Sequence, residues 1–153
     1  MDVRFRGEHA LRTDDKCRLA IPAAYRSALQ AHGDARLVIT RSLTDACLQV
    51  FPAKAWAQYE DKILTLPRSD PTVRRVLQFQ VTSSVLIEPD GHGRFVLPPA
   101  LRTHAGLGPA MDVTVASQID RFEIWAQDRW LAEQALCAET LGQWSADLAR
   151  LGL

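Results

Sequence analysis

The sequence has no excess of charge of either sign. Its 153 residues carry 18 lysines and arginines against 18 aspartates and glutamates, so the formal net charge at pH 7 is zero. This balance counts against nucleic-acid binding by bulk charge, which needs a basic domain. The first 26 residues still hold six cations against four acidic residues. This small local excess supports DNA binding only if several copies of the protein lie side by side. These cations are Arg4, Arg6, Arg12, Lys16, Arg18 and Arg26.

Long apolar runs and paired cysteines are also absent. No stretch of about 18 apolar residues occurs, so we expect no membrane-spanning helix and no membrane partner. The cysteines Cys17, Cys47 and Cys137 are odd in number, far apart and without Cys-x-x-Cys spacing, which argues against a disulfide framework and a zinc site. The first residues lack the apolar core of a signal peptide. Together these features predict a protein of the reducing cytoplasm.

Motifs for catalysis are missing as well. The four histidines are scattered, and no Gly-x-Ser-x-Gly or phosphate-binding glycine-rich loop is present. Asp14 and Asp90 could be imagined as a carboxylate pair, but each has an arginine four residues away. Such a neighbour lowers a carboxyl pKa and favours a permanently ionised structural group. We therefore expect no catalytic residue, no metal, no cofactor and no small-molecule substrate.

One motif occurs twice in the chain. The segment 14–22, DDKCRLAIP, returns 76 positions later at 90–98 as DGHGRFVLP. Both copies read Asp-x-x-x-Arg, then three apolar residues, then proline. Residues 25–26 match 101–102 in the same register, and after a slip of two residues 48–51 match 122–125. This pattern indicates an internal duplication of a turn-strand-helix-strand unit, whose two halves can pair as a pseudo-dimer.

The hydrophobic pattern predicts four short strands in each half, with one short helix between the second and third. Pro22 and Pro98 begin the two short helices, and Gly33 and Gly106 end them. Four short strands and one short helix cannot enclose a core alone, so we expect the halves to interleave.

The expected elements of the first half are a strand within 3–11, strands at 18–21, 37–40 and 47–51, and helices at 23–31 and 53–64. After a helix over 71–82 with Asp70 as its N-cap, the second half has strands at 84–88, 94–97, 113–117 and 121–125. From residue 128 onward, apolar residues recur at helical spacing, with Gly142 as a candidate break. We expect this stripe to dock on the body or on a neighbouring subunit. The expected divisions are an N-terminal half over 1–66, a connecting helix over 67–83, a C-terminal half over 84–130 and a C-terminal helix over 131–153.

Four segments carry a family resemblance, in the right order and spacing from about Arg4 to Trp130. They are Phe5-Arg6-Gly7, the motif at 14–22, Leu66-Pro67-x-Ser69-Asp70, and the run from Arg121 to Trp125. Together they resemble the MraZ family of bacterial transcription regulators. The resemblance implies an α+β fold in which two tandem swapped-hairpin, AbrB-like halves form an intramolecular pseudo-dimer β-barrel with flanking helices.

The resemblance also implies a function and an assembly. We expect a nucleoid-associated repressor that binds short G-rich direct repeats of double-stranded DNA in promoters of cell-division and cell-wall genes. It implies closed homo-oligomeric rings of eight or more subunits, so that neighbouring subunits engage successive repeats. A non-DNA-binding assembly protein with the same fold remains an alternative, as does, more distantly, a small double-barrel enzyme. Salt-sensitive DNA binding would separate the first function from both.

The Asp-x-x-x-Arg motif has two interpretations. In one, the aspartate caps its own turn and the arginine pins it. In the other, Lys16 and Arg18 point toward DNA, where arginine can donate two hydrogen bonds to guanine and lysine can grip phosphate. The resemblance favours DNA contacts for Arg18 and Lys16, with Arg6 and Arg4 assisting and Asp14 shaping the loop. Charge favours this first copy, so we expect Asp90 and Arg94 to be structural.

Cys17 departs from the family pattern, which usually has glycine between the lysine and the arginine. Glycine tolerates a positive φ at little cost, whereas a side chain adds strain there. Either this turn has an ordinary φ or the loop is slightly reshaped. Cys17 also lies between two cations in the sequence, which should favour its thiolate.

Overall fold

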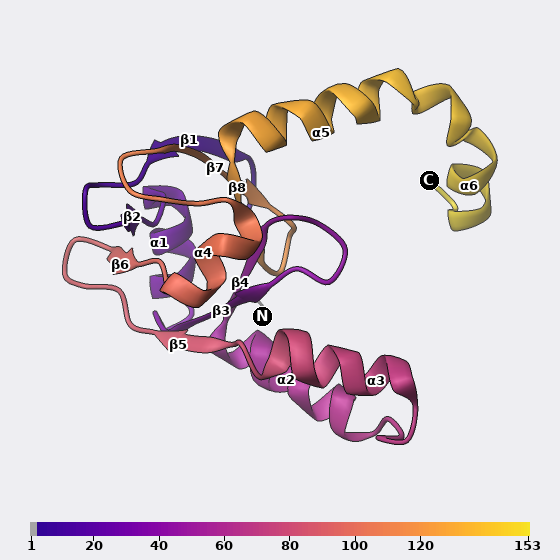
Figure 1. The fold of residues 1–153 in the computed structure, drawn as a ribbon, viewed down its shortest axis with the longest axis horizontal. Helices are drawn as coiled ribbons and strands as arrows, with labels where there is room; N and C mark the ends of the chain where they lie inside the picture. Colours follow the sequence, from indigo (N-terminus) through magenta and orange to yellow (C-terminus); the bar gives the residue numbers. More distant parts are fainter. Residues whose placement is uncertain (1–2) are drawn as a thin grey trace.

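The computed structural model describes residues 3–153 as an α+β fold. The first half contains β1 (Glu8–Arg12), β2 (Arg18–Ala20), α1 (Ala23–Ala31), β3 (Leu37–Arg41), β4 (Leu48–Pro52) and α2 (Ala53–Leu64). A connection follows, made of α3 (Pro71–Val76) and the π-helical turn η1 (Leu77–Val81). The second half contains β5 (Val85–Ile87), β6 (Arg94–Val96), α4 (Pro99–Ala105), β7 (Asp112–Ser117), β8 (Phe122–Ala126) and α5 (Gln127–Glu139). The 3₁₀ turn η2 (Leu141–Gln143) and α6 (Ser145–Leu151) complete the described chain (Figure 1).

Each half repeats the order strand, strand, helix, strand, strand, helix, which confirms the predicted duplication. The helices predicted at 23–31 and 53–64 have those bounds, and Asp70 caps α3 by accepting a hydrogen bond from the Thr72 N–H. The first strand begins only at Glu8, because Gly7 has φ +82° and interrupts the extended backbone before it.

Strand pairing exchanges elements between the halves. The larger sheet is antiparallel with the order β1-β7-β8-β4-β3-β5, and β2 pairs with β6 in a second sheet. β1 of the first half pairs with β7, while its counterpart β5 pairs with β3. At the centre β4 pairs with β8, with Leu48 opposite Ile124. The halves therefore interleave about a pseudo-two-fold axis, as the repeat predicts. The expected barrel is not shown, since the strands form two separate sheets.

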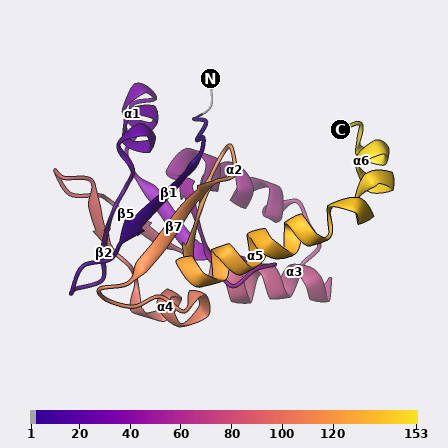
Figure 2. The same cartoon turned by 90° about the horizontal axis from the view of Figure 1, so that it is seen from above.

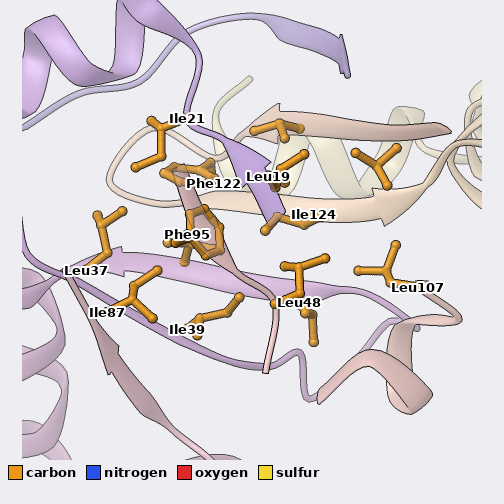
Figure 3. Packing of buried hydrophobic residues seen from close by; sticks show 14 of the residues in the cluster. Leu19, Ile21, Leu37, Ile39, Leu48, Ile87, Phe95, Leu107, Phe122 and Ile124 are labelled. Carbon is orange, nitrogen blue, oxygen red and sulfur yellow. The ribbon is translucent and has the colours of Figure 1, made fainter. Parts of the chain in front are cut away.

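The hydrophobic core lies between these two sheets. Leu19 and Phe95, which face each other across the β2–β6 pair, pack among side chains of the larger sheet such as Leu37 and Ile124 (Figure 3). All four are at most 6% exposed. Burying a side chain of this size contributes about 1.5–3 kcal/mol, and here each half supplies apolar surface that the other covers. A half on its own would leave this surface in water.

Two helical arms extend from the strand body (Figures 1 and 2). One contains α2 and α3, which carry the buried residues Trp56, Ile63 and Val73. The other contains α5, η2 and α6, in which no residue is buried. The break predicted at Gly142 occurs at η2. Across residues 3–153 the helices are too short or too polar to be candidates for crossing a bilayer.

The first arm is joined to the sheet by a buried glutamine. The predicted helix over 71–82 changes to π-helical winding at η1, where the Thr82 N–H donates to the Leu77 carbonyl. This winding accompanies burial of Gln80, whose Oε1 accepts from the Tyr59 hydroxyl at 2.5 Å and whose Nε2 donates to Gln49 Oε1 at 3.1 Å. One polar side chain thus connects α2, η1 and β4.

Candidate nucleic-acid interface

The first Asp-x-x-x-Arg turn is ordered around one carboxylate. Asp14 Oδ1 accepts hydrogen bonds from the backbone N–H groups of Lys16 at 2.9 Å and Arg18 at 2.8 Å. Its Oδ2 accepts from Arg18 Nε at 2.6 Å. The hydrogen bond from the Arg18 N–H is the largest cause that holds the pKa of the Asp14 carboxyl below its usual value. This carboxylate therefore orders the backbone of its own turn and holds the Arg18 side chain.

The second turn repeats this geometry. Asp90 Oδ1 accepts from the backbone N–H groups of His92 and Arg94 at 2.8 and 3.0 Å. The hydrogen bond from the Arg94 N–H is the first cause that lowers the pKa of Asp90. The ion pair from Arg94 Nε to Asp90 Oδ2 is longer, at 3.4 Å. The turns share one backbone scaffold, and the first holds its arginine more closely.

Arg18 can pin its turn and still present hydrogen-bond donors. Its Nε is bonded to Asp14, but within residues 3–153 no protein acceptor is bonded to its two terminal nitrogens. The side chain remains one-third exposed. A guanidinium held at Nε presents its outer nitrogens in a fixed direction, which suits bidentate recognition. The two interpretations of the motif are therefore compatible.

Lys16 is the cation that distinguishes the first turn from the second. It is exposed and takes part in no ion pair among the described residues. The equivalent position in the second turn is His92. Arg12, which the sequence places nearby, is paired with Asp112 at 2.9 Å. Asp15 in the first turn stands where the second has Gly91, so the two turns have the same formal net charge and differ in the exposed lysine that the first one presents.

Arg4 and Arg6 lie at the other end of β1 from this turn. Both are exposed, and Phe5 between them donates its N–H to the Ile119 carbonyl in the β7–β8 turn. Since β1 has five residues, the strand separates these arginines from the Asp14 turn by about 17 Å. The four candidate DNA contacts thus form two groups within one chain.

Arg102 is a cation near the first turn that sequence reasoning missed. Its Nε donates to the Leu97 carbonyl at 2.7 Å, and Leu97 in turn bonds the Cys17 carbonyl through its N–H. Its counterpart Arg26 covers Gly93 in the second turn, where a Cβ would collide with the Arg26 side chain. The match of 25–26 with 101–102 was the available signal. Each arginine serves the turn of the opposite half, which only the strand exchange reveals.

Cys17 has a left-handed backbone conformation with φ +60°, close to the +73° of Gly93 at the equivalent position. The turn therefore keeps the shape that glycine favours and accepts a strained side chain. The predicted thiolate is wrong. The thiol is 1% exposed, and burial raises its pKa although the charge of Arg102 acts in the opposite direction.

A buried carboxyl lies at the centre of the larger sheet. Glu123 on β8 accepts hydrogen bonds from Trp125 Nε1 at 3.1 Å and from Gln118 Nε2 at 3.2 Å. Burial raises the pKa of Glu123, and burial followed by the charge of Glu123 raises the pKa of the neighbouring Cys47. Gln49 faces Glu123 across the β4–β8 pair and occupies the equivalent position of the first half. Nothing in this arrangement activates Cys47 as a nucleophile, because its thiol is held protonated.

Comparisons with known proteins agree with the duplicated architecture. A family model described as "MraZ protein, putative antitoxin-like" matches residues 4–79 and again residues 82–140. The transcriptional regulator MraZ of Shewanella oneidensis strain MR-1 is 38% identical over 137 residues, which cover 90% of this chain and 89% of the relative. Proteins of the same name from Shewanella sp. strain ANA-3 and Shewanella baltica strain OS155 are 37% identical with the same coverage.

Proposed function

Because this chain belongs to the MraZ family of transcriptional regulators, a non-enzymatic family, we propose that it is a repressor that binds short G-rich direct repeats in double-stranded DNA. The repeats would lie in promoters of cell-division and cell-wall genes, and the protein would act at the nucleoid in the cytoplasm. The observation that carries this proposal is the Asp14-ordered turn, which holds Arg18 at Nε, while its outer nitrogens and Lys16 have no protein partner among residues 3–153.

Each candidate contact has a distinct role in this proposal. The outer nitrogens of Arg18 donate to guanine O6 and N7 in the major groove, a contact that discriminates against a wrong base by about 1–3 kcal/mol. Lys16 grips phosphate, and Asp14 fixes the direction of Arg18. Arg4 and Arg6 contact the DNA backbone about 17 Å away, beyond the far end of β1. Asp90 and Arg94 shape the second turn.

Specificity requires assembly, because a few cationic contacts alone give dissociation constants of roughly 10⁻⁴–10⁻⁶ M. In the proposed ring of eight or more subunits, adjacent copies bind successive repeats, so the later contacts are effectively intramolecular. The two sheets of each chain would act as one pseudo-dimer barrel. Within the chain, 1–66 supplies the DNA contacts, 67–83 connects, 84–130 supports, and 131–153 is free for assembly.

The test compares the two turns on one DNA. Binding to a duplex with several G-rich direct repeats is measured across a salt series for wild type, Arg18→Ala and the matched control Arg94→Ala. We expect Arg18→Ala to weaken binding roughly 5- to 150-fold and to relax the preference for guanine, while Arg94→Ala binds like wild type. If Arg94→Ala fails while assembling normally, the second turn is the DNA contact. If wild type shows no salt-sensitive binding, the alternative of an assembly protein replaces the repressor.

A further inference from the structure

The second arm has apolar side chains that no other part of residues 3–153 covers. Leu131, Leu136, Leu141 and Leu151 are each more than half exposed, and α6 packs chiefly on η2. Figures 1 and 2 show α5 and α6 extending away from the strand body. Exposed leucines along an arm that extends from the body make this arm a candidate interaction site. The question is which surface it fits.

Charge narrows the choice of partner. Glu133 and Glu139 lie three residues before and after Leu136, so the three side chains share one side of α5. Among residues 3–153 neither glutamate takes part in an ion pair. We call Glu133, Leu136 and Glu139 the acidic stripe. Its partner should carry two unpaired cations on either side of an apolar or hollowed surface.

The first arm offers such a surface along α2. A groove of about 390 Å³ follows one side of this helix and includes Lys54 and Lys62 near its two ends, with Tyr59 between them. The acidic groups in its lining are already paired, Asp34 with Arg36 and Asp120 with Arg121. Lys54 and Lys62 have no ion pair in the described chain.

The two surfaces are opposite in charge and similar in spacing. Lys54 and Lys62 are eight residues apart, about 12 Å along the helix, and Glu133 and Glu139 are six residues apart, about 9 Å. Long lysine side chains can span this difference. We propose that the acidic stripe of one copy docks along the α2 groove of a second copy. This inference rests on the proposed function for its assembly, and it names the surfaces that form the contact.

A nucleic acid is the other occupant that two lysines could indicate. The groove is also lined by the apolar side chains of Phe51, Pro52 and Ala55, which offer nothing to phosphate. Leu136, which lies between the two glutamates of the acidic stripe, can pack against apolar side chains of this kind. The observations therefore favour a second copy of this chain over DNA.

The test is charge reversal with rescue. The first variant carries Lys54→Glu and Lys62→Glu, the second Glu133→Lys and Glu139→Lys, and the third all four substitutions. Mass in solution is measured by light scattering after gel filtration, and folding by circular dichroism. We expect each double variant to fall to a lower mass and the fourfold variant to regain the wild-type mass. The matched control, Arg74→Glu with Arg75→Glu on α3, makes the same charge change outside the groove and should assemble normally.

The outcomes distinguish this inference from the ring itself. If wild type has the mass of one chain at every concentration, both the proposed ring and this contact are wrong. If wild type assembles and neither double variant changes its mass, or the fourfold variant fails to recover, only the docking inference is overturned. If the lysine variant keeps its mass but loses affinity for a single repeat, the groove is a DNA contact instead.

Discussion

Cys17 and Gly93 occupy equivalent turns in the same left-handed conformation, but they differ in what a change would cost. A side chain in this conformation costs about 1–2 kcal/mol. At Cys17 that strain coexists with burial of the thiol in the core. At Gly93 the Arg26 side chain stands where a Cβ would be. The first turn therefore accommodates a side chain in this conformation, whereas at Gly93 the second turn has no room for a Cβ unless Arg26 moves.

We predict that Gly93→Ala lowers the free energy of unfolding by about 1–3 kcal/mol, because it adds both backbone strain and a collision with Arg26. Cys17→Gly should change it by less than about 1 kcal/mol, since relief of strain offsets the lost burial and the greater freedom of the unfolded chain. Denaturant unfolding at matched protein concentration measures both. The opposite ranking would show that the first turn relies on its cysteine.

Glu123 makes the stability of the folded protein depend on pH, and the direction of this dependence follows from its pKa. Its pKa is raised in the folded state, so the folded protein holds this proton more tightly than the unfolded chain. Stability is therefore lost as pH rises from the ordinary pKa of glutamate to the raised value. Glu123→Gln retains an acceptor for Trp125 and removes the charge.

Melting temperatures measured between pH 4 and pH 8 test this prediction. Glu123→Gln should melt above wild type at pH 8, and the difference should shrink toward pH 4, where the native carboxyl is protonated. Glu60→Gln on the exposed side of α2 is the control and should follow the wild-type curve. Parallel curves for wild type and Glu123→Gln would contradict the assignment of a buried, proton-holding carboxyl.

At the scale of elements, the duplication explains most of what the sequence predicts. Two equal motifs with the same strand order must pair symmetrically. The duplication therefore predicts the number of strands, the helices that begin at Pro22 and Pro98, and the interleaving of the halves. It does not predict the position of Arg4 and Arg6, because that depends on where β1 begins after Gly7. The position of Arg102 could not be predicted either, since this residue reaches the first turn only through the exchange of strands between the halves.

Gln80 is the clearest case of an element that the pattern could not predict. In a regular helix over 71–82 a glutamine between Phe79 and Val81 is an ordinary polar residue. The π-helical winding of η1 instead accompanies its burial against Tyr59 and Gln49. Side-chain networks of this kind depend on contacts between distant segments, which local periodicity does not encode.

We predict that Gln80→Leu loosens the first arm. The substitution leaves the Tyr59 hydroxyl and the Gln49 amide without a partner, at a cost of about 1–3 kcal/mol. Hydrogen exchange should accelerate in α3 and η1 and stay unchanged in β2 and β6. Gln78→Leu, at an exposed position of the same turn, should alter stability by no more than about 0.5 kcal/mol. Equal exchange in both variants would mean that Gln80 does not hold the arm.

For the whole molecule, the neutral net charge and the exposed arms both point to assembly of several copies. A single chain offers one turn with Lys16 and Arg18 and, about 17 Å away, Arg4 and Arg6, which is little for a sequence-specific regulator. Contacts between copies through the arms would multiply these turns along one DNA. Binding strength should then depend on the number of repeats more than on the charge of any one subunit.

The most direct measurement of this account is the affinity of the wild-type protein for duplexes of equal length that carry one or three G-rich direct repeats, at one fixed salt concentration. Multivalent binding predicts that three repeats bind at least about 100-fold more tightly than one, within the usual range of avidity for linked sites. Equal affinity for one and three repeats would contradict the account, because it would mean that adjacent subunits do not bind the same DNA together.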